Sequence, residues 1–145
     1  MRISLIGDYN WESKIDHATK VADLRSVFES SDYGPGLSSL VICLNCRDPS
    51  LEHKQRVRFE KNGATLYVDV MLALPYFVHA THVERRKTIV DEVMAQTRQV
   101  LIDRHIARFE TDSFLADLSL AMEDQFNGPL SSRFDKFVLE KATGY

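Results

Sequence analysis

Residues 55–72, QRVRFEKNGATLYVDVML, decide the fold, because a strong turn signal divides two runs of alternating apolar and polar residues. Asn62 and Gly63 tolerate the positive φ angles that both central positions of a two-residue hairpin turn require. The stretch therefore predicts an antiparallel hairpin of strands 55–61 and 64–73.

The turn also fixes the register of this hairpin, since Lys61 then lies opposite Ala64. Counting outward places apolar residues opposite one another on one face and polar or aromatic residues opposite one another on the second. The apolar pairs are Phe59 with Leu66 and Val57 with Val68, and the second face pairs Arg58 with Tyr67 and Arg56 with Asp69. Two alternations that agree under one register support the hairpin.

Residues 38–47 precede the hairpin and contain the apolar run LVICL. A strand that is apolar on both faces is typical of the centre of a sheet that is covered on both sides. The same segment carries both cysteines, Cys43 and Cys46, in a C-x-x-C spacing. Residues three apart in a strand point to opposite faces, so we interpret the cysteines as packing residues rather than a redox or metal site.

The N-terminal part of the chain has two predicted elements. Residues 2–6, RISLI, are either a short strand or an extended arm. Residues 11–30 carry apolar side chains at helical spacing behind Asn10, which can act as an N-cap. We therefore expect a helix over 11–30.

Two further helices are predicted after the hairpin. Thr81 and Glu84 have the spacing of a capping box, which predicts the start of a long helix over residues 82–108. Asp112 can cap a third helix over 112–127, which ends where Gly128 and Pro129 follow. Residues 133–141 are predicted as a short helix or strand.

Together these elements predict an α+β fold, with an antiparallel sheet of three to four strands packed against helices 11–30, 82–108 and 112–127. The chain has 145 residues, of which 44% are hydrophobic and 27% charged, and we expect a single domain over 1–145. Its apolar runs are shorter than a membrane span, and its first residues lack a signal-peptide pattern. We therefore expect a cytoplasmic protein with reduced thiols and no membrane contact.

The net charge of −3 is unevenly distributed along the chain. Residues 109–132 contain five acidic residues and no lysine or arginine, whereas nucleic-acid-binding proteins usually carry a basic excess. An acidic segment of this kind attracts a basic protein partner, although it can also be a solvated surface without one. The residues that we expect to contact a partner are Asp112, Asp117, Leu120, Glu123, Asp124 and Phe126.

A second candidate site is the polar face of the hairpin, formed by Arg56, Arg58, Tyr67 and Asp69. These side chains could bind an anion or another small ligand. The alternative is a cross-strand ion pair on a solvated or helix-covered face.

Catalytic and metal-binding motifs are not recognisable in the sequence. It has no Ser/His/Asp order and no Gly-rich phosphate loop, and the GPG at 34–36 is interpreted as a turn. His79 and His82 are three residues apart, and His53 or His105 could join them at a metal. His79 precedes the predicted N-cap, however, so it is not on the same regular helix as His82, and no acidic partner lies at a metal-site spacing. We therefore expect no enzymatic activity, no metal and no cofactor.

Three stretches, LSSLVICLNCRDPS, QRVRFEKNGATLYVDVML and ERRKTIVDEV, resemble small immunity proteins of bacterial polymorphic-toxin systems, in particular those of contact-dependent growth inhibition. The likeness covers about residues 37–108. It leaves out the N-terminal segment and the acidic C-terminal segment.

The resemblance implies a cytoplasmic protein that binds and neutralises a cognate toxin domain. Such a toxin is most often a nuclease, and it frequently acts on transfer RNA. Such a protein occludes the basic active or substrate-binding site of its toxin and needs no chemistry of its own. It does not bind nucleic acid directly. The alternative function is a small-ligand-binding or regulatory module that uses the polar hairpin face. Such a module could be a homodimer.

Overall fold

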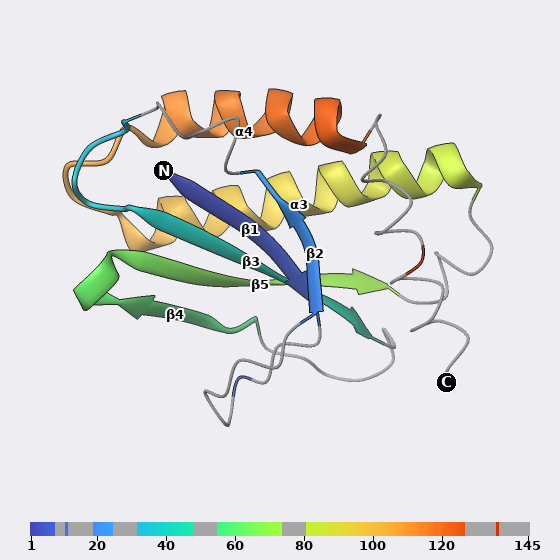
Figure 1. Ribbon diagram of the computed structural model, residues 1–145, viewed down its shortest axis with the longest axis horizontal. Helices are drawn as coiled ribbons and strands as arrows, with labels where there is room; N and C mark the ends of the chain where they lie inside the picture. The colour runs from blue at the N-terminus through green and yellow to red at the C-terminus, as the bar shows by residue number, and fades with distance from the viewer. Residues whose placement is uncertain are drawn as a thin grey trace.

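The computed structural model contains a five-stranded sheet with two helices on one of its sides (Figure 1). The structure describes residues 1–7, 11, 19–24, 32–47, 55–73, 81–126 and 136. The strands are β1 Arg2–Gly7, β2 Thr19–Asp23, β3 Ser39–Arg47, β4 Val57–Glu60 and β5 Thr65–Ala73. Their order across the sheet is β2-β1-β3-β5-β4. This arrangement confirms the α+β class.

The three central strands are parallel, so the prediction of an antiparallel sheet is wrong at its centre. β3 pairs in parallel with β1 on one side and with β5 on the other, while β2 and β4 pair antiparallel at the two edges. The predicted strand over 38–47 is confirmed as β3. Its residues Leu40, Ile42, Cys43 and Leu44 are at most 1% exposed, and burial on both faces is typical of strands in parallel sheets.

The predicted helix over 11–30 is wrong at residues 19–23, which form β2 and extend the sheet beyond β1. Ladder pairing with β1, from Ser4 with Asp23 to Gly7 with Thr19, outweighs the local helical spacing because strand formation depends on the neighbouring strand. Trp11 lies in a turn, and most other residues of this predicted helix lie outside the described ones. Residues 2–6 belong to a strand rather than an arm.

The hairpin is confirmed together with its register. Val57 lies opposite Val68, Arg58 opposite Tyr67 and Phe59 opposite Leu66, and the Asp69 amide donates a hydrogen bond to the Arg56 carbonyl at 3.0 Å.

The turn of this hairpin differs from the predicted two-residue turn. Residues Lys61–Gly63 form a 3-10 turn, and Ala64 takes the left-handed conformation at φ 44°. The loop therefore has four residues instead of two. Both loops are centred on the bond between Asn62 and Gly63, so the longer loop leaves the predicted register unchanged.

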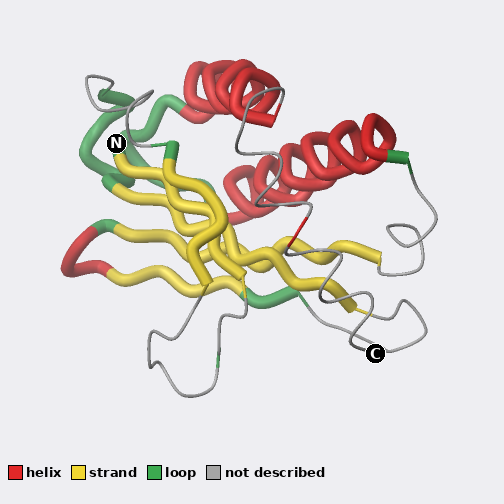
Figure 2. Tube along the Cα trace, turned by 45° about the vertical axis from the view of Figure 1, so that its right-hand side comes forward, coloured by secondary structure: helices red, strands yellow, loops and turns green. Residues whose placement is uncertain are grey.

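Two helices form a layer on one side of the sheet, α3 (His82–Arg104) and α4 (Thr111–Phe126) (Figure 2). They run antiparallel to each other (Figure 1). The predicted capping box is confirmed, since the Thr81 hydroxyl accepts from the Glu84 amide and the Glu84 carboxylate accepts from the Thr81 amide.

Both helices match their predicted ranges closely. α3 ends four residues before the predicted 108, because His105 takes a left-handed conformation at φ 53°. α4 begins at Thr111, so Asp112 lies in its first turn and is not the residue before it. The element predicted over 133–141 lies outside the described residues except for Lys136.

One hydrophobic core joins the sheet to the two helices. It contains alternate residues of the central strands and the inner faces of α3 and α4, among them Ile3, Leu5, Leu40, Leu66, Val68, Ile89, Val93, Leu101, Phe114 and Leu118. Because the inner faces of both helices are buried in the core, the charged side chains of these helices that the structure describes lie on the outside of the molecule.

Candidate functional site

α4 presents an acidic outer surface because its apolar residues face the core. Phe114, Leu118 and Met122 are fully buried, and Leu115 and Ala121 are nearly so. These positions recur at three- and four-residue spacing, which leaves the other faces of the helix to solvent. The acidic side chains of the helix lie on those faces and are exposed, namely Asp112, Asp117, Glu123 and Asp124.

Leu120 stands among these carboxylates. Its side chain is 67% exposed. Residues three and four positions away are neighbours on a helix surface, and for Leu120 these are Ala116, Asp117, Glu123 and Asp124. An apolar side chain inside a charged rim has the layout of a protein-binding contact.

We refer to Asp112, Asp117, Leu120, Glu123 and Asp124 as the acidic patch. The structure brings these five predicted residues together on the outer surface of one helix. Phe126 is the last residue of that helix, and its side chain lies outside the described part of the structure. Its role stays a prediction.

Tyr33 holds one member of the acidic patch in place. Its hydroxyl donates a hydrogen bond to a carboxylate oxygen of Asp117 at 2.5 Å. The Tyr33 ring is buried and packs edge-on against Phe109 and Phe114, with ring centroids 6.2 and 5.3 Å away. Asp117 therefore has a structural contact in addition to any role in binding.

The loop that carries Tyr33 packs backbone to backbone against the connection between α3 and α4, with which it lies side by side in Figure 1. The Glu110 amide donates to the Tyr33 carbonyl at 2.8 Å, and the Gly36 amide donates to the Arg108 carbonyl at 3.4 Å. A Cβ atom at Gly34 would lie 2.1 Å from the Arg108 carbonyl oxygen. The loop thus fastens the start of α4 to the rest of the molecule.

The polar face of the hairpin is built from contacts within the sheet. The Arg58 guanidinium lies 4.3 Å from the centre of the Tyr67 ring and 3.4 Å from the Glu60 carboxylate. Asp69 is fully buried and accepts a hydrogen bond from the Asn45 side chain on β3. The structure therefore brings Arg58, Tyr67 and Asp69 to one face of the sheet, where their contacts stabilise neighbouring strands. Arg56, the fourth predicted residue, is exposed at the start of β4.

Cys43 is a buried free thiol beside this polar face. Burial raises the pKa of the Cys43 thiol well above its ordinary value of 9.0, and the Asp69 carboxylate raises that pKa further. The thiolate is the form that attacks electrophiles and binds metals, so this environment makes Cys43 a poor nucleophile. Cys46 lies in the same continuous strand. The burial of Cys43 agrees with its interpretation as a packing residue, and the side chain of Cys46 lies outside the described part of the structure.

The histidines give no metal centre within the described residues. No group of three or more His, Cys, Asp or Glu side chains there is placed to hold a metal ion. His79 and His53 lie outside the described part of the chain. His105 is exposed in the turn after α3.

Sequence reasoning missed the loop residues Tyr33, Gly34 and Gly36. The stretch DYGPG was interpreted only as a helix-ending turn. An aromatic residue next to two glycines was the available signal, since closely packed loops need both a buried anchor and positions without a side chain.

The architecture defines a small α+β domain that presents a charged helix surface and whose described residues contain no recognisable catalytic centre. A family model described as immunity protein 44 matches residues 1–124, and the chain therefore belongs to this family. No curated protein and no solved structure gives a significant match.

The family match is broader than the resemblance seen in the sequence. It includes the N-terminal strands and every residue of the acidic patch, and it stops before Phe126. The protein is thus a member of a family of immunity proteins, for which a cognate toxin is the expected partner. No helix in the described part of the chain is long and apolar enough to cross a membrane.

Proposed function

We propose that the protein neutralises its cognate toxin by placing the acidic patch of α4 in a basic cleft of the toxin domain. The observation that carries this proposal is Leu120, which is 67% exposed and has three carboxylates among its nearest helix-surface neighbours. A buried apolar anchor with a charged rim gives both affinity and register to a protein contact. The partner surface that fits it is an apolar pocket surrounded by lysine and arginine.

The toxin that fits this surface best is a nuclease, including one that cleaves transfer RNA. A cleft that binds nucleic acid must carry positive charge to neutralise the phosphates. An acidic helix that occupies the same cleft competes with the substrate for those positive groups. The system is one of contact-dependent growth inhibition, and inhibition takes place in the cytoplasm, where the nucleic-acid substrate is found.

Inhibition by occlusion requires no reaction by the immunity protein itself. The acidic patch lies on a regular helix whose inner face is fixed in the core, so the surface is formed before the toxin arrives. Such preorganisation lowers the ordering cost of binding, and complementary charge speeds the encounter. The protein therefore acts as a binding protein and not as an enzyme.

The test of the charged rim compares two variants with the same change in net charge. We expect Glu123→Lys/Asp124→Lys to weaken binding to the toxin domain encoded directly upstream by roughly a hundredfold and to remove protection of cells from it. The control, Asp91→Lys/Asp103→Lys, alters exposed residues of α3 and should bind nearly as wild type does. Equal losses in both variants, or none in the first, would contradict the proposed surface.

The apolar anchor has its own matched control. Leu120→Ala should weaken binding roughly tenfold or more, because it empties the centre of the contact. Ile102→Ala shortens a side chain that is 50% exposed on α3, and it should leave binding unchanged. Asp117→Asn removes a charge but keeps an oxygen that can accept from Tyr33. It therefore tests the charge of Asp117 in toxin binding without removing the hydrogen bond that supports the fold. Undiminished affinity of Leu120→Ala would exclude this residue as the anchor.

A further inference from the structure

β4 is the last strand of the sheet, and no further strand lies beyond it in the described structure. The hydrogen bond from the Asp69 amide to the Arg56 carbonyl fixes which backbone groups of this strand face inward. In an antiparallel pair the inward-facing residues alternate, so Arg58 and Glu60 also direct their amides and carbonyls toward β5. Val57 and Phe59 therefore direct their amides and carbonyls toward the side of β4 that no described strand occupies.

An open strand edge can pair with another strand, and the residues of β4 decide which strand fits it. We propose that this edge binds the same edge of a second copy of the chain, in an antiparallel pairing with a two-fold axis at Arg58. Val57 of each copy then lies opposite Phe59 of the other. Because both are outward-facing positions, the two pairs exchange four backbone hydrogen bonds.

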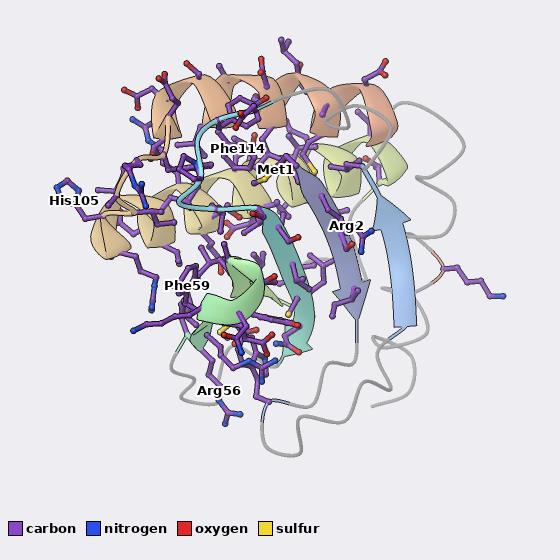
Figure 3. The ribbon with its side chains drawn as sticks, turned by 60° about the vertical axis from the view of Figure 1, so that its left-hand side comes forward. Met1, Arg2, Arg56, Phe59, His105 and Phe114 are labelled. Carbon is purple, nitrogen blue, oxygen red and sulfur yellow. The ribbon has the colours of Figure 1, made fainter. Side chains whose placement is uncertain are left out.

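The side chains of β4 are complementary to themselves in this register. Arg56 of each copy lies opposite Glu60 of the other, which gives two ion pairs across the axis. On the opposite face, Val57 lies opposite Phe59 twice, and aromatic pairs with β-branched residues stabilise neighbouring strands. Figure 3 shows Arg56 extending away from the sheet at the start of β4, where it can reach a second copy.

Two neighbouring registers that keep outward-facing residues together fit less well. A two-fold axis at Val57 would place Arg56 opposite Arg58 of the other copy twice, and like charges directly opposite one another are destabilising. An axis at Phe59 would require Lys61 to continue the strand, but Lys61 belongs to the 3-10 turn. The axis at Arg58 uses both outward-facing residues and forms both ion pairs.

The axis at Arg58 brings two arginines opposite each other, and the fold reduces their repulsion. The Arg58 guanidinium lies over the Tyr67 ring of β5 and 3.4 Å from Glu60 of its own chain. Its charge is therefore drawn over its own sheet and is partly neutralised there. On the other face, the Arg104 guanidinium lies 5.9 Å from the centre of the Phe59 ring, beside the apolar pairs.

The purified chain alone is the sample for the test, so the result is independent of any toxin. Sedimentation over a wide range of concentration should show wild type passing from monomer to dimer. Arg56→Glu turns both ion pairs into contacts between two carboxylates, and Glu60→Arg turns both into contacts between two guanidinium groups. Each change should lower the association constant roughly tenfold. The two variants mixed should form a heterodimer of near wild-type affinity. One of its contacts across the axis joins the two substituted residues with their charges exchanged, and the other joins the native Arg56 of one variant to the native Glu60 of the other.

Two controls accompany the test. Lys87→Glu on α3 changes the net charge by the same amount as Arg56→Glu, and it should leave dimerisation unchanged. Thermal unfolding must show that both edge variants are folded. A wild type that stays monomeric at every concentration would overturn the proposal. So would a dimer that Arg56→Glu strengthens or leaves intact, because the axis would then lie elsewhere. If wild type is monomeric and the Arg56→Glu variant no longer binds the toxin, the edge contacts the toxin and not a second copy.

Discussion

Gly34 occupies a position that only glycine fits, both for its conformation and for its neighbours. Its φ is +109°, and the space that a side chain would need holds the Arg108 carbonyl. The contact matters because the same loop carries Tyr33 and its hydrogen bond to the acidic patch. A side chain at this residue would therefore disturb the loop that contacts the start of α4.

We expect Gly34→Ala to lower the free energy of unfolding by at least about 2 kcal/mol, since it combines backbone strain with a clash against a carbonyl that cannot rotate away. Chemical denaturation followed by circular dichroism measures the change. Gly63→Ala is the control, because its added Cβ would meet only the Thr65 hydroxyl at 3.2 Å in an exposed turn. Similar losses in the two variants would show that the loop packing is not responsible.

The buried Cys43 thiol makes stability depend on alkaline pH. Because its pKa is raised on folding, the native state keeps the proton above pH 9 while the unfolded state loses it. The native state then binds more protons, so stability falls with rising pH, by at most about 1.4 kcal/mol per pH unit. Below about pH 8 both states are protonated and the effect disappears.

The measurement compares Cys46→Ala with Cys43→Ala/Cys46→Ala in denaturant unfolding between neutral and alkaline pH. Cys43 is then the single thiol of the first variant, since the chain has two cysteines. We expect the difference in stability between the variants to change above pH 9 and to stay constant below pH 8. A constant difference throughout would mean that the Cys43 pKa is not raised by burial.

At the scale of elements, the features predicted correctly are those that local chemistry determines. The hairpin register follows from the residues around Asn62 and Gly63, and α3 begins where Thr81 and Glu84 form their capping box. β2 was missed because its strand conformation depends on β1, a distant partner that no local spacing reveals. The clustering of the acidic patch was predicted for the same reason as the helices, because which residues share a helix face depends only on their spacing in the sequence.

The capping box offers a direct test at this scale. Thr81→Ala removes the acceptor for the Glu84 amide at the start of α3, and we expect a loss of about 1 kcal/mol in the free energy of unfolding. Thr81→Ser keeps the hydroxyl and should lose only a small part of that. Thermal and denaturant unfolding give both values. If the serine variant lost as much as the alanine variant, the methyl group and not the cap would be the stabilising feature.

At the scale of the whole molecule, the topology was the least predictable property. The parallel pairing of β1, β3 and β5 joins segments that are far apart in the sequence, and no turn between them specifies it. The apolar run of β3 indicated a strand covered on both faces but did not reveal the direction of its neighbours. The clustering of the acidic patch was easier to predict than the sheet, because it needs only one helix and its charges.

The separation of charge in the folded molecule leads to a last prediction, which concerns rates. The acidic patch on α4 carries four carboxylates, whereas the end of α3, the loop that follows it and the β4 edge carry exposed basic residues that include Arg56, Arg104 and Arg108. A basic toxin domain should therefore be steered toward α4, and salt should screen that attraction, since the Debye length falls from about 10 Å at 0.1 M to about 3 Å at 1 M. We expect the association rate constant for the upstream toxin to fall at least about tenfold over this range, while the dissociation rate constant changes much less.

Stopped-flow or surface-based kinetics measure both constants. In Glu123→Lys/Asp124→Lys the salt dependence of association should be nearly lost, and in Asp91→Lys/Asp103→Lys it should persist. A salt dependence that is equal in the two variants would place the electrostatic attraction away from α4.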